Sequence, residues 1–325
     1  MSKLSVIVVN YNTRNLVSQC IASLQDNPPG CLFEVILVDN ASTDGSCEEI
    51  ESKFPSVRII RNTRNLGFAA ANNQGLALAQ GEFLLLLNSD TIVIRGSLDK
   101  MSEAAELNPD VGIVAPKLVY PDGSVQMSYG ALPNLMMVFC SFFEIKRLIP
   151  QSMRQRLGRS RWTKLLGETI ANYVDWFSGG KPTTKILSRD LLATGACLLI
   201  RRQCFEEVGF LDPNIFFYCE DADYCERVHD SGWKILYLAE ATVVHIKGGT
   251  TGERYRWTSP HAYESTLYFL RKHRGWVAFQ VARCFALLSL LLRWIVDSIT
   301  GRENASASWK LLRQVANNTG SPQVY

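Results

Sequence analysis

The 325-residue chain lacks the short signatures that mark several common protein classes. It has nine cysteines but no CxxC pair and no even ladder of cysteine spacings, so neither a zinc site nor a disulfide framework is indicated. We expect reduced thiols that mostly fill the core of a cytosolic protein. A basic leader followed by a cleavable apolar segment is also missing, which argues against secretion. The sequence shows no internal repeat and no low-complexity linker.

Glycine-rich phosphate-binding loops are missing as well. The P-loop pattern GxxxxGK[ST] does not occur. The first apolar run, Leu4–Val9, leads into Asn10-Tyr-Asn-Thr-Arg14, which contains no glycine. A dinucleotide-binding fingerprint needs glycines at this point, and so does the loop that normally opens a sugar-1-phosphate nucleotidyltransferase. The sequence therefore argues against both classes, and the nucleotidyltransferase is retained only as an alternative.

Charge is unevenly distributed along the chain, although the net charge is only +3. Residues 146–164 contain seven Lys or Arg and no acid, and residues 271–325 carry a net +6, which leaves about −10 for the rest. Such segregation predicts that two segments face an anionic surface, with solvated basic loops as the alternative. No nucleic-acid partner is expected.

The first ninety residues alternate apolar runs with helical patterns, which is typical of an α/β fold. Continuous apolar runs predict strands that are buried on both faces of a parallel sheet. Right-handed crossovers between them predict a mostly parallel sheet flanked by helices. The expected strands are 4–9, 33–38, 57–60 and 83–87, and the expected helices are 15–24, 44–53 (capped by Ser42 or Thr43) and 68–79. Asn10, Asp39, Asn62 and Asp90 follow strand ends, where ligands of such sheets bind.

The remainder of the chain divides into three parts. A helix at 97–107, a strand at 111–115 and a hairpin turn at Tyr120–Gly123 continue the pattern, and a partly apolar, basic insert at about 130–190 interrupts it. Order resumes with an apolar run at 191–200, helices at 203–208 and up to about 231, and a strand at 234–238 that leads to His245. We therefore expect a catalytic domain over residues 1–250 and a helical tail over residues 251–325.

A carboxylate cluster follows the aromatic run that ends at Cys219. Glu220 and Asp221 are predicted to precede a helix and to face a cleft at the rim of the core, where a carboxylate can act as a general base. Asp223 lies four residues before Arg227, a spacing that predicts an ion pair on the helix surface. The catalytic candidates are therefore Asp221 and Glu220.

Two segments are candidates for binding a nucleotide. The Asp39 carboxylate can accept a hydrogen bond from the ring N–H of uracil or thymine, although a helix cap is the alternative role. Gly67 permits a positive φ and a close backbone approach, and the helix N-terminus behind it can hold diphosphate oxygens. A plain glycine turn before a core helix would also explain Gly67.

The segment Asn88-Ser-Asp90 offers one carboxylate to a metal ion. Mg²⁺ commonly takes one or two carboxylates and completes its shell with phosphate oxygens and water. His245 would add an imidazole ligand and shift the preference toward Mn²⁺. A lone histidine at a strand end also fits a structural role, so both interpretations of His245 stay open.

Together and in this order, these motifs resemble the family 2 glycosyltransferases of the GT-A fold, and most of all the rhamnosyltransferase-type branch. The resemblance spans about residues 3–250. The matching motifs are Val9-Asn-Tyr-Asn12, Val38-Asp-Asn-Ala-Ser-Thr-Asp44, Asn65-Leu-Gly-Phe68, Asn88-Ser-Asp90, Thr194-Gly-Ala196, Glu220-Asp-Ala-Asp223 and Gly232-Trp233. One departure is Asn88, which stands where the family often has the first of two metal-motif aspartates.

The resemblance implies inverting transfer of a sugar, with rhamnose a candidate, from a dTDP-, UDP- or GDP-linked donor. The implied acceptor is a polyprenyl-linked saccharide in cell-surface polysaccharide synthesis. Asp221 matches the general base, while Asp90, with His245 as a further candidate, would bind Mg²⁺ or Mn²⁺. The donor-binding candidates are Asn10, Asn12, Asp39, Asn65, Gly67, Asn72 and Ser89. The alternative is a catalytically silent scaffold that binds nucleotide sugars. The presence of both Asp90 and Asp221 argues against this alternative.

Residues 276–299 predict an amphipathic helix in the tail. The uninterrupted apolar run, Cys284–Leu292, is nine residues long, well short of the roughly 20 that span a bilayer. Arg283, Arg293 and Asp297 fall off the apolar face, and each arginine would cost about 2.5–3.5 kcal/mol near the bilayer centre. The apolar face comprises Val277, Val281, Cys284, Phe285, Leu288, Leu291, Leu292, Ile295 and Ile299.

An in-plane helix on an anionic membrane is therefore expected, which places the protein peripherally on the inner face of the cell membrane. The apolar segment Leu135–Phe143 in the insert is a candidate for a second contact. Docking of the tail on the catalytic domain, or on a second subunit in a homodimer, is the alternative.

Overall fold

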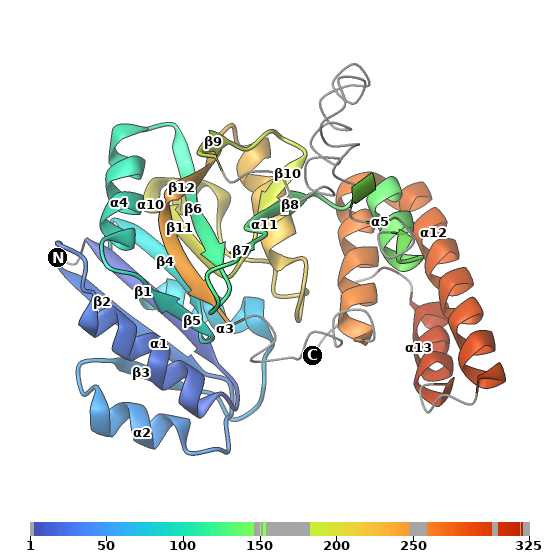
Figure 1. Ribbon diagram of the computed structural model, residues 1–325, viewed down its shortest axis with the longest axis horizontal. Helices are drawn as coiled ribbons and strands as arrows, with labels where there is room; N and C mark the ends of the chain where they lie inside the picture. The colour runs from blue at the N-terminus through green and yellow to red at the C-terminus, as the bar shows by residue number, and fades with distance from the viewer. Residues whose placement is uncertain are drawn as a thin grey trace. The chain divides into compact units, whose positions relative to one another are not determined.

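The computed structural model describes residues 3–145, 150, 152–153, 183–246, 259–300, 305–318 and 320. The chain divides into two compact units (Figure 1). The sheet unit comprises residues 1–130, 181–213 and 220–251, and the helical unit comprises residues 131–180, 214–219 and 252–325. The first described residues of the insert thus group with the tail helices rather than with the sheet.

The sheet unit is built on a mixed, mostly parallel sheet, as the sequence predicts. Its strand order is β3-β2-β1-β4-β11-β6-β12-β5, and the first four strands are parallel neighbours. Strand β11 runs antiparallel to β4 and β6, whereas β12 is parallel to β6 and antiparallel to β5. The bounds are β1 Leu4–Asn10, β2 Phe33–Asp39, β3 Arg58–Arg61, β4 Phe83–Asn88, β5 Thr91–Val93, β6 Val111–Val119, β11 Cys197–Arg201 and β12 Lys234–His245.

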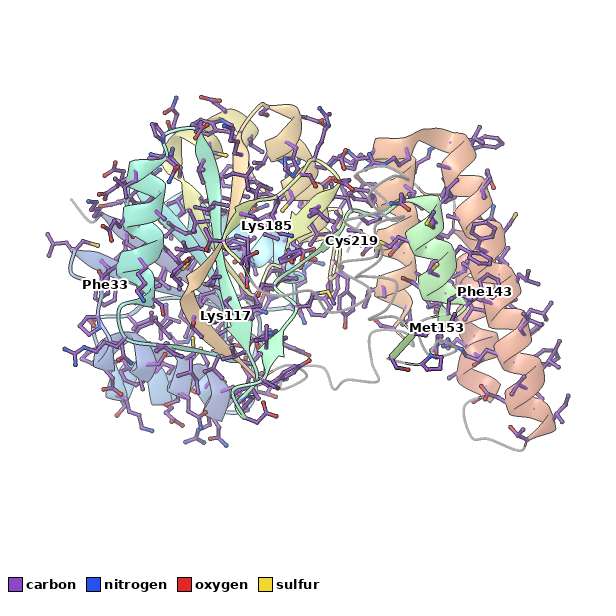
Figure 2. The ribbon with its side chains drawn as sticks, turned by 45° about the horizontal axis from the view of Figure 1, so that its top comes forward. Phe33, Lys117, Phe143, Met153, Lys185 and Cys219 are labelled. Atoms are coloured by element: carbon purple, nitrogen blue, oxygen red, sulfur yellow. The ribbon has the colours of Figure 1, made fainter. Side chains whose placement is uncertain are left out.

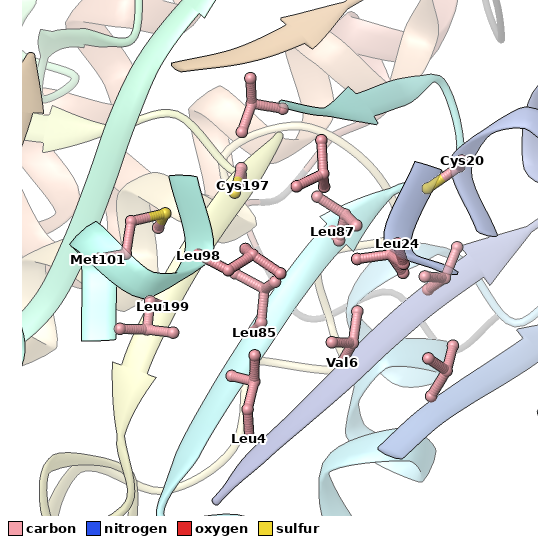
Figure 3. Packing of buried hydrophobic residues seen from close by; sticks show 14 of the residues in the cluster. Leu4, Val6, Cys20, Leu24, Leu85, Leu87, Leu98, Met101, Cys197 and Leu199 are labelled. Atoms are coloured by element: carbon pink, nitrogen blue, oxygen red, sulfur yellow. The ribbon is translucent and has the colours of Figure 1, made fainter. Parts of the chain in front are cut away.

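Helices cover both faces of the sheet (Figure 1). Val6 and Val8 of β1 join one apolar cluster while Ile7 and Val9 join the other, because successive strand residues point to opposite faces. Figure 3 shows the first cluster, in which Leu85 and other strand residues pack with residues of the covering helices. The helices are α1 Arg14–Asp26, α2 Ser46–Lys53, α3 Phe68–Leu78, α4 Ser97–Leu107, α10 Arg202–Val208 and α11 Glu220–Asp230.

Three local expectations are corrected by the structure. Helix α2 begins at Ser46 with Gly45 (φ 79°) at its N-cap and without a side-chain cap, so the predicted caps are wrong. The Ser42 hydroxyl instead contacts the loop that follows β1. The run at 191–200 forms two strands, β10 (Leu191–Ala193) and β11, separated by a turn. Strand β5, directly after Asp90, was not predicted.

The hairpin at Tyr120–Gly123 is confirmed. It joins β6 to β7 (Val125–Gln126), which pairs antiparallel with β6 so that Gln126 lies opposite Leu118. The remaining short strands of the sheet unit are β8 (Tyr129–Ala131), which pairs with β10, and β9 (Lys185–Ile186), which pairs with β12. Figure 2 labels Lys185, whose ammonium lies 4.3 Å from the centre of the Tyr129 ring.

The helical unit contains α5 (Leu135–Phe142), α12 (Pro260–Ile299) and α13 (Ala305–Asn317). Helix α12 is interrupted at Gly275, whose backbone is not helical (φ 85°, ψ 177°), so its second segment coincides with the predicted helix 276–299. Helix α12 is long enough and apolar enough to cross a membrane, judged by its length and composition alone. The seven basic residues predicted to face an anionic surface at 146–164 lie outside the described residues.

Candidate active site

The carboxyl ends of β1 and β2 carry a network of buried polar groups. Asn10 lies opposite Asp39 in the sheet register and donates from Nδ2 to Asp39 Oδ1 (2.8 Å) and to Ser42 Oγ (2.9 Å). The Ser42 backbone N–H donates to Asp39 Oδ2 (2.9 Å). Both carboxylate oxygens of Asp39 thus accept a hydrogen bond from this network. This arrangement fixes the direction of the carboxylate and does not cap a helix.

The loop after β1 extends this network toward the metal motif. Thr13 donates from Oγ1 to Asn10 Oδ1 (2.5 Å), and the same Oγ1 lies 3.1 Å from Ser89 Oγ, whose hydroxyl can donate to it. Asn12 has a left-handed backbone (φ 52°), and its Oδ1 accepts from the Thr43 backbone N–H at 2.8 Å. The donor-binding candidates Asn10, Asn12 and Ser89 therefore belong to one connected group of side chains.

A second asparagine cluster organises the loop before α3. Asn40 donates from Nδ2 to Asn65 Oδ1 (2.8 Å) and to the Gly67 carbonyl (3.1 Å). Asn65 Oδ1 also accepts from the Gly67 N–H at 2.9 Å. Gly67 has φ 84° and ψ 170°, a region open essentially to glycine alone, so its predicted positive φ is confirmed. Buried Asn72 donates to the Phe68 carbonyl within the same helix (2.9 Å).

Asp90 and His245 are brought together by the pairing of β5 with β12. His245 lies opposite Thr91 in this register, and the Ile246 N–H donates to the Asp90 carbonyl at 2.8 Å. The Asp90 Oδ1 and His245 Nε2 atoms are 3.3 Å apart, and the two side chains are only 4% and 14% exposed. Cis ligands of one Mg²⁺-sized ion lie about 3 Å apart. A carboxylate and an imidazole at this separation fit a divalent cation.

Asn88, two residues before Asp90 in the chain, contributes a further buried acceptor. Its Oδ1 is buried and has no hydrogen-bond partner within the described residues. A buried polar atom without a partner is costly unless a ligand satisfies it. The oxygen of Asn88 is thus available to a bound ligand although its residue carries no charge.

The turn between β10 and β11 connects this region to Asp221. Asn88 N–H donates to the Ala196 carbonyl (3.0 Å), and Gly195 N–H donates to Asp221 Oδ2 (3.0 Å). If position 195 carried a side chain, its Cβ would lie 3.3 Å from Asp221 Cβ. Glycine therefore lets the backbone approach Asp221 closely, and a larger residue would crowd the Asp221 side chain. Backbone donors of this kind favour the ionised carboxylate, which is the form that accepts a proton.

The expected position of the carboxylate cluster is partly wrong. Glu220 and Asp221 do not precede α11 but form its first turn, and Glu220 is only 7% exposed. Asp223 pairs with Arg227 as predicted (2.9 Å), but it is fully buried rather than on the surface. Arg227 also donates to the carbonyls of Val208 and Phe210, so this ion pair ties α11 to the loop after α10.

Two consecutive residues before α11 have unusual backbones. Tyr218 and Cys219 both adopt positive φ (67° and 65°), the left-handed region that non-glycine residues rarely occupy. Strain of this kind clusters at functional sites. It lies immediately before Glu220 and Asp221 in the chain.

Five of the nine cysteines are buried, as expected of thiols that mostly fill the core, whereas Cys284 is exposed. None of the nine forms a disulfide with another, and all nine lie within the described residues. Burial raises the pKa of Cys20 to about 12 and that of Cys47 to about 11. Both thiols therefore stay protonated near neutral pH, which makes them poor nucleophiles and poor metal ligands.

Sequence reasoning assigned no role to Gln126, whose side chain contacts His245 through both of its amide atoms. Gly195 was named only within the motif Thr194-Gly-Ala196, and its contact with Asp221 was not predicted. The only local signal for Gln126 is a polar residue three positions after the hairpin turn, and its partner is 119 residues away.

The comparisons with known proteins decide the family. The family model described as "Glycosyl transferase family 2" matches residues 5–178, more than half of the chain. This chain belongs to glycosyltransferase family 2. An N-acetylglucosaminyl-diphospho-decaprenol L-rhamnosyltransferase from Mycobacterium tuberculosis is 30% identical over 296 residues, covering 84% of this chain and 86% of that protein. An O-antigen biosynthesis protein from Myxococcus xanthus is 26% identical, covering 75% of this chain and 17% of that protein.

Solved structures agree with the predicted fold of this family 2 glycosyltransferase. A mannosyltransferase from Pyrobaculum calidifontis, solved with GDP-Man and Mn²⁺, superposes with a TM-score of 0.56 at 15% identity. The match covers 97% of this chain and 86% of that chain. The prediction of a GT-A fold is thereby confirmed.

Proposed function

We propose that this glycosyltransferase moves a deoxyhexose, with rhamnose the first candidate, from a nucleotide-diphosphate donor to a polyprenyl-linked saccharide. The observation that carries the proposal is the placement of Asp221, held by the Gly195 N–H, in the same compact unit as the buried Asp90–His245 pair. The mycobacterial relative, whose name specifies an N-acetylglucosaminyl-diphospho-decaprenol and an L-rhamnosyl group, supports both the acceptor class and the sugar.

The proposed reaction inverts the anomeric carbon in one displacement. The acceptor hydroxyl gives its proton to the Asp221 carboxylate as its oxygen attacks the anomeric carbon. The bond from that carbon to the diphosphate breaks on the opposite face, and its electron pair leaves with the nucleoside diphosphate. Because attack and departure occur on opposite faces, the product has the inverted configuration.

Donor binding is assigned to the two networks at the carboxyl ends of β1, β2 and β3. The Asp39 carboxylate suits the ring N–H of a uracil or thymine base, as in a dTDP or UDP donor. The N-terminus of α3, opened by Gly67, suits the diphosphate. Asn12 and Ser89, which are joined to this network, are proposed to complete the nucleotide site.

Asp90 and His245 are proposed to hold a divalent cation, Mg²⁺ or Mn²⁺. Such an ion would offset the charge that develops on the leaving diphosphate. The Asn88 oxygen, which has no partner among the described residues, lies in the same segment and suits a ligand that donates a hydrogen bond. The mixed carboxylate and imidazole donors favour Mn²⁺ over Mg²⁺.

Release of nucleoside diphosphate from a donor panel separates this proposal from its alternatives. We expect the purified full chain to hydrolyse a dTDP- or UDP-sugar slowly without acceptor, because water can replace the acceptor hydroxyl. Binding without any hydrolysis would indicate a silent scaffold. Formation of a nucleotide sugar from a sugar-1-phosphate and a nucleoside triphosphate would instead indicate a nucleotidyltransferase.

The helical unit is proposed to bind an anionic membrane from the cytoplasmic side. Most residues of the apolar face predicted for α12 are exposed, whereas Phe285 packs with its ring centre 5.2 Å from that of Phe139 in α5. The opposite face of α12 packs on the other helices of the unit: Arg283 donates to the Val315 carbonyl (3.3 Å), and Arg293 contacts Glu144 (3.0 Å). The exposed members of the apolar face are Val277, Cys284, Leu288, Leu291, Leu292, Ile295 and Ile299.

Contacts of α13 favour an in-plane orientation over a span. Helix α13 lies along the second segment of α12. Arg283 donates to the Val315 carbonyl near one end of α13, and Asp297 accepts a hydrogen bond from Ser308 Oγ (3.3 Å) near the other. A spanning α12 would carry exposed Lys310 and Arg313 of α13 to bilayer depth, at about 2.5–3.5 kcal/mol each near the centre. An in-plane α12 buries the apolar face and leaves these charges in water.

Substitution of this face tests the membrane contact. We expect the full chain to float with anionic liposomes, less at high salt, because exposed Arg271, Lys272 and Arg274 add screened attraction of about 1 kcal/mol each. The double variant Leu292→Glu, Ile295→Glu should lose most of this binding. Leu107→Glu, at a position 73% exposed in the sheet unit, is the matched control. Undiminished flotation of the double variant, or a stable dimer that ignores liposomes, would refute the contact.

A further inference from the structure

The most informative contact outside the predicted site is that of Gln126 with His245. Gln126 ends the short strand β7 and is 5% exposed. Its Nε2 is 3.2 Å from the backbone carbonyl oxygen of His245, and its Oε1 is 2.6 Å from Nδ1 of the same residue. One side chain thus contacts both the backbone and the ring of one histidine.

These two contacts determine where the ring proton lies. A backbone carbonyl only accepts hydrogen bonds, so the amide atom that faces it must be the nitrogen. The other amide atom is then the oxygen, which only accepts, so the ring nitrogen beside it must carry the proton. In the neutral form of the imidazole, which has one N–H, this proton is therefore on Nδ1 rather than on Nε2. Nε2 of His245 is left with a lone pair, 3.3 Å from Asp90 Oδ1.

We propose that Gln126 is a positioning residue that holds His245 in the Nδ1-protonated tautomer, so that Nε2 and the Asp90 carboxylate present lone pairs to one divalent cation. This inference rests on the proposed metal role of Asp90 and His245. A purely structural histidine beside a carboxylate would donate from Nε2 to Asp90. Gln126 fixes the ring proton on the opposite nitrogen, where it cannot block a metal ion.

The hairpin after β6 explains how the fold places Gln126. Pairing puts Gln126 opposite Leu118 on β6, and β6 also pairs with β12, where Val243 lies opposite Leu118. The Leu118 N–H donates to Ser128 Oγ at 2.7 Å, which holds the chain just beyond Gln126 against β6. Ser128 therefore supports the same hairpin, and within the described residues its side chain contacts Leu118 and not His245, which makes it a suitable control position.

Two substitutions at Gln126 distinguish the effect of its hydrogen-bond acceptor from the effect of its side-chain size. Gln126→Met keeps the length of the side chain and removes the acceptor, whereas Gln126→Glu keeps an acceptor for the Nδ1 proton. In metal-free protein, ¹⁵N NMR of His245 should show the Nδ1–H tautomer in the wild type and in Gln126→Glu, and an increased share of Nε2–H in Gln126→Met. Mn²⁺ affinity, measured by electron paramagnetic resonance with UDP present, should fall about 10–100-fold in Gln126→Met. It should stay close to wild type in Gln126→Glu and in the control Ser128→Ala.

Three results would overturn this role of Gln126. They are an Nε2–H tautomer in the wild type, an unchanged tautomer with unchanged Mn²⁺ affinity in Gln126→Met, and a loss of affinity in Ser128→Ala as large as that in Gln126→Met. Failure of the wild type to bind Mn²⁺ at all refutes the metal role itself. The tautomer is read without metal, so the failure of the positioning role and the failure of the metal role are distinguishable.

Discussion

Asp221→Asn is expected to lower the rate of sugar transfer by about 10²–10⁴-fold while donor affinity stays close to wild type. Asparagine has the shape of aspartate, and its Oδ1 can still accept the Gly195 N–H that holds Asp221 Oδ2 at 3.0 Å. It cannot take the proton of the acceptor hydroxyl. Single-turnover transfer kinetics, together with calorimetric titration of the nucleotide sugar, separate the chemical step from binding.

Glu220→Gln is the matched comparison for this prediction. Glu220 is the neighbouring carboxylate in the first turn of α11 and is 7% exposed. We expect this variant to retain much more activity than Asp221→Asn, because Asp221 is the carboxylate that the Gly195 N–H directs and that matches the general base in the resemblance. Near-normal turnover by Asp221→Asn together with an inactive Glu220→Gln would assign the general base to Glu220.

Removal of divalent metal should suppress transfer, and added Mn²⁺ or Mg²⁺ should restore it. Asp90 is the only carboxylate in its motif and lies 3.3 Å from His245 Nε2, so its loss leaves a single strong ligand. Asp90→Ala should therefore weaken nucleoside diphosphate binding only when metal is present. Calorimetric titration with UDP or dTDP, with and without EDTA, measures both effects.

A carboxylate at the opposite end of β12 from His245 provides the control. Asp110, just before β6, is 56% exposed and pairs with Lys234, so Asp110→Ala changes the charge equally without touching the proposed ligands. It should bind nucleoside diphosphate as the wild type does. Equal affinity of the wild type with and without metal would contradict the metal role.

Most of the sheet unit could be predicted because its signals are local. Strands such as β1 are buried on both faces and read as continuous apolar runs, and turn residues separate them from the helices. The short strands β5 and β7 could not be predicted, since a three-residue or two-residue strand is defined by its partner rather than by its own pattern.

The candidate site was predictable to the extent that it lies at strand ends. Asn10 and Asp39 follow neighbouring strands, and the structure brings them into direct contact. The contact of Gln126 with His245 depends on pairing between segments 119 residues apart, for which the sequence offers no local sign. The placement of Glu220 in a helix was missed because positive φ at Cys219 allows the helix to begin directly after the aromatic run.

The tail shows a third limit of sequence reasoning. The periodicity of residues 276–299 identifies an apolar face but not what covers it. In the structure the small residues Ala282 and Ala286 are buried on the other face, and Arg283 reaches the end of α13. Only this packing shows which residues of the predicted apolar face stay exposed.

The central claim is tested most directly by the product of transfer to a lipid-linked acceptor. The full chain, with Mn²⁺ and a liposome-borne polyprenyl-diphospho-N-acetylglucosamine, should convert a dTDP- or UDP-deoxyhexose into a lipid-linked disaccharide and release the nucleoside diphosphate. Nuclear magnetic resonance of the released disaccharide should show a new glycosidic bond whose anomeric configuration is opposite to that of the donor. A retained configuration, or an acceptor that stays unmodified with every donor in the panel, would contradict the account.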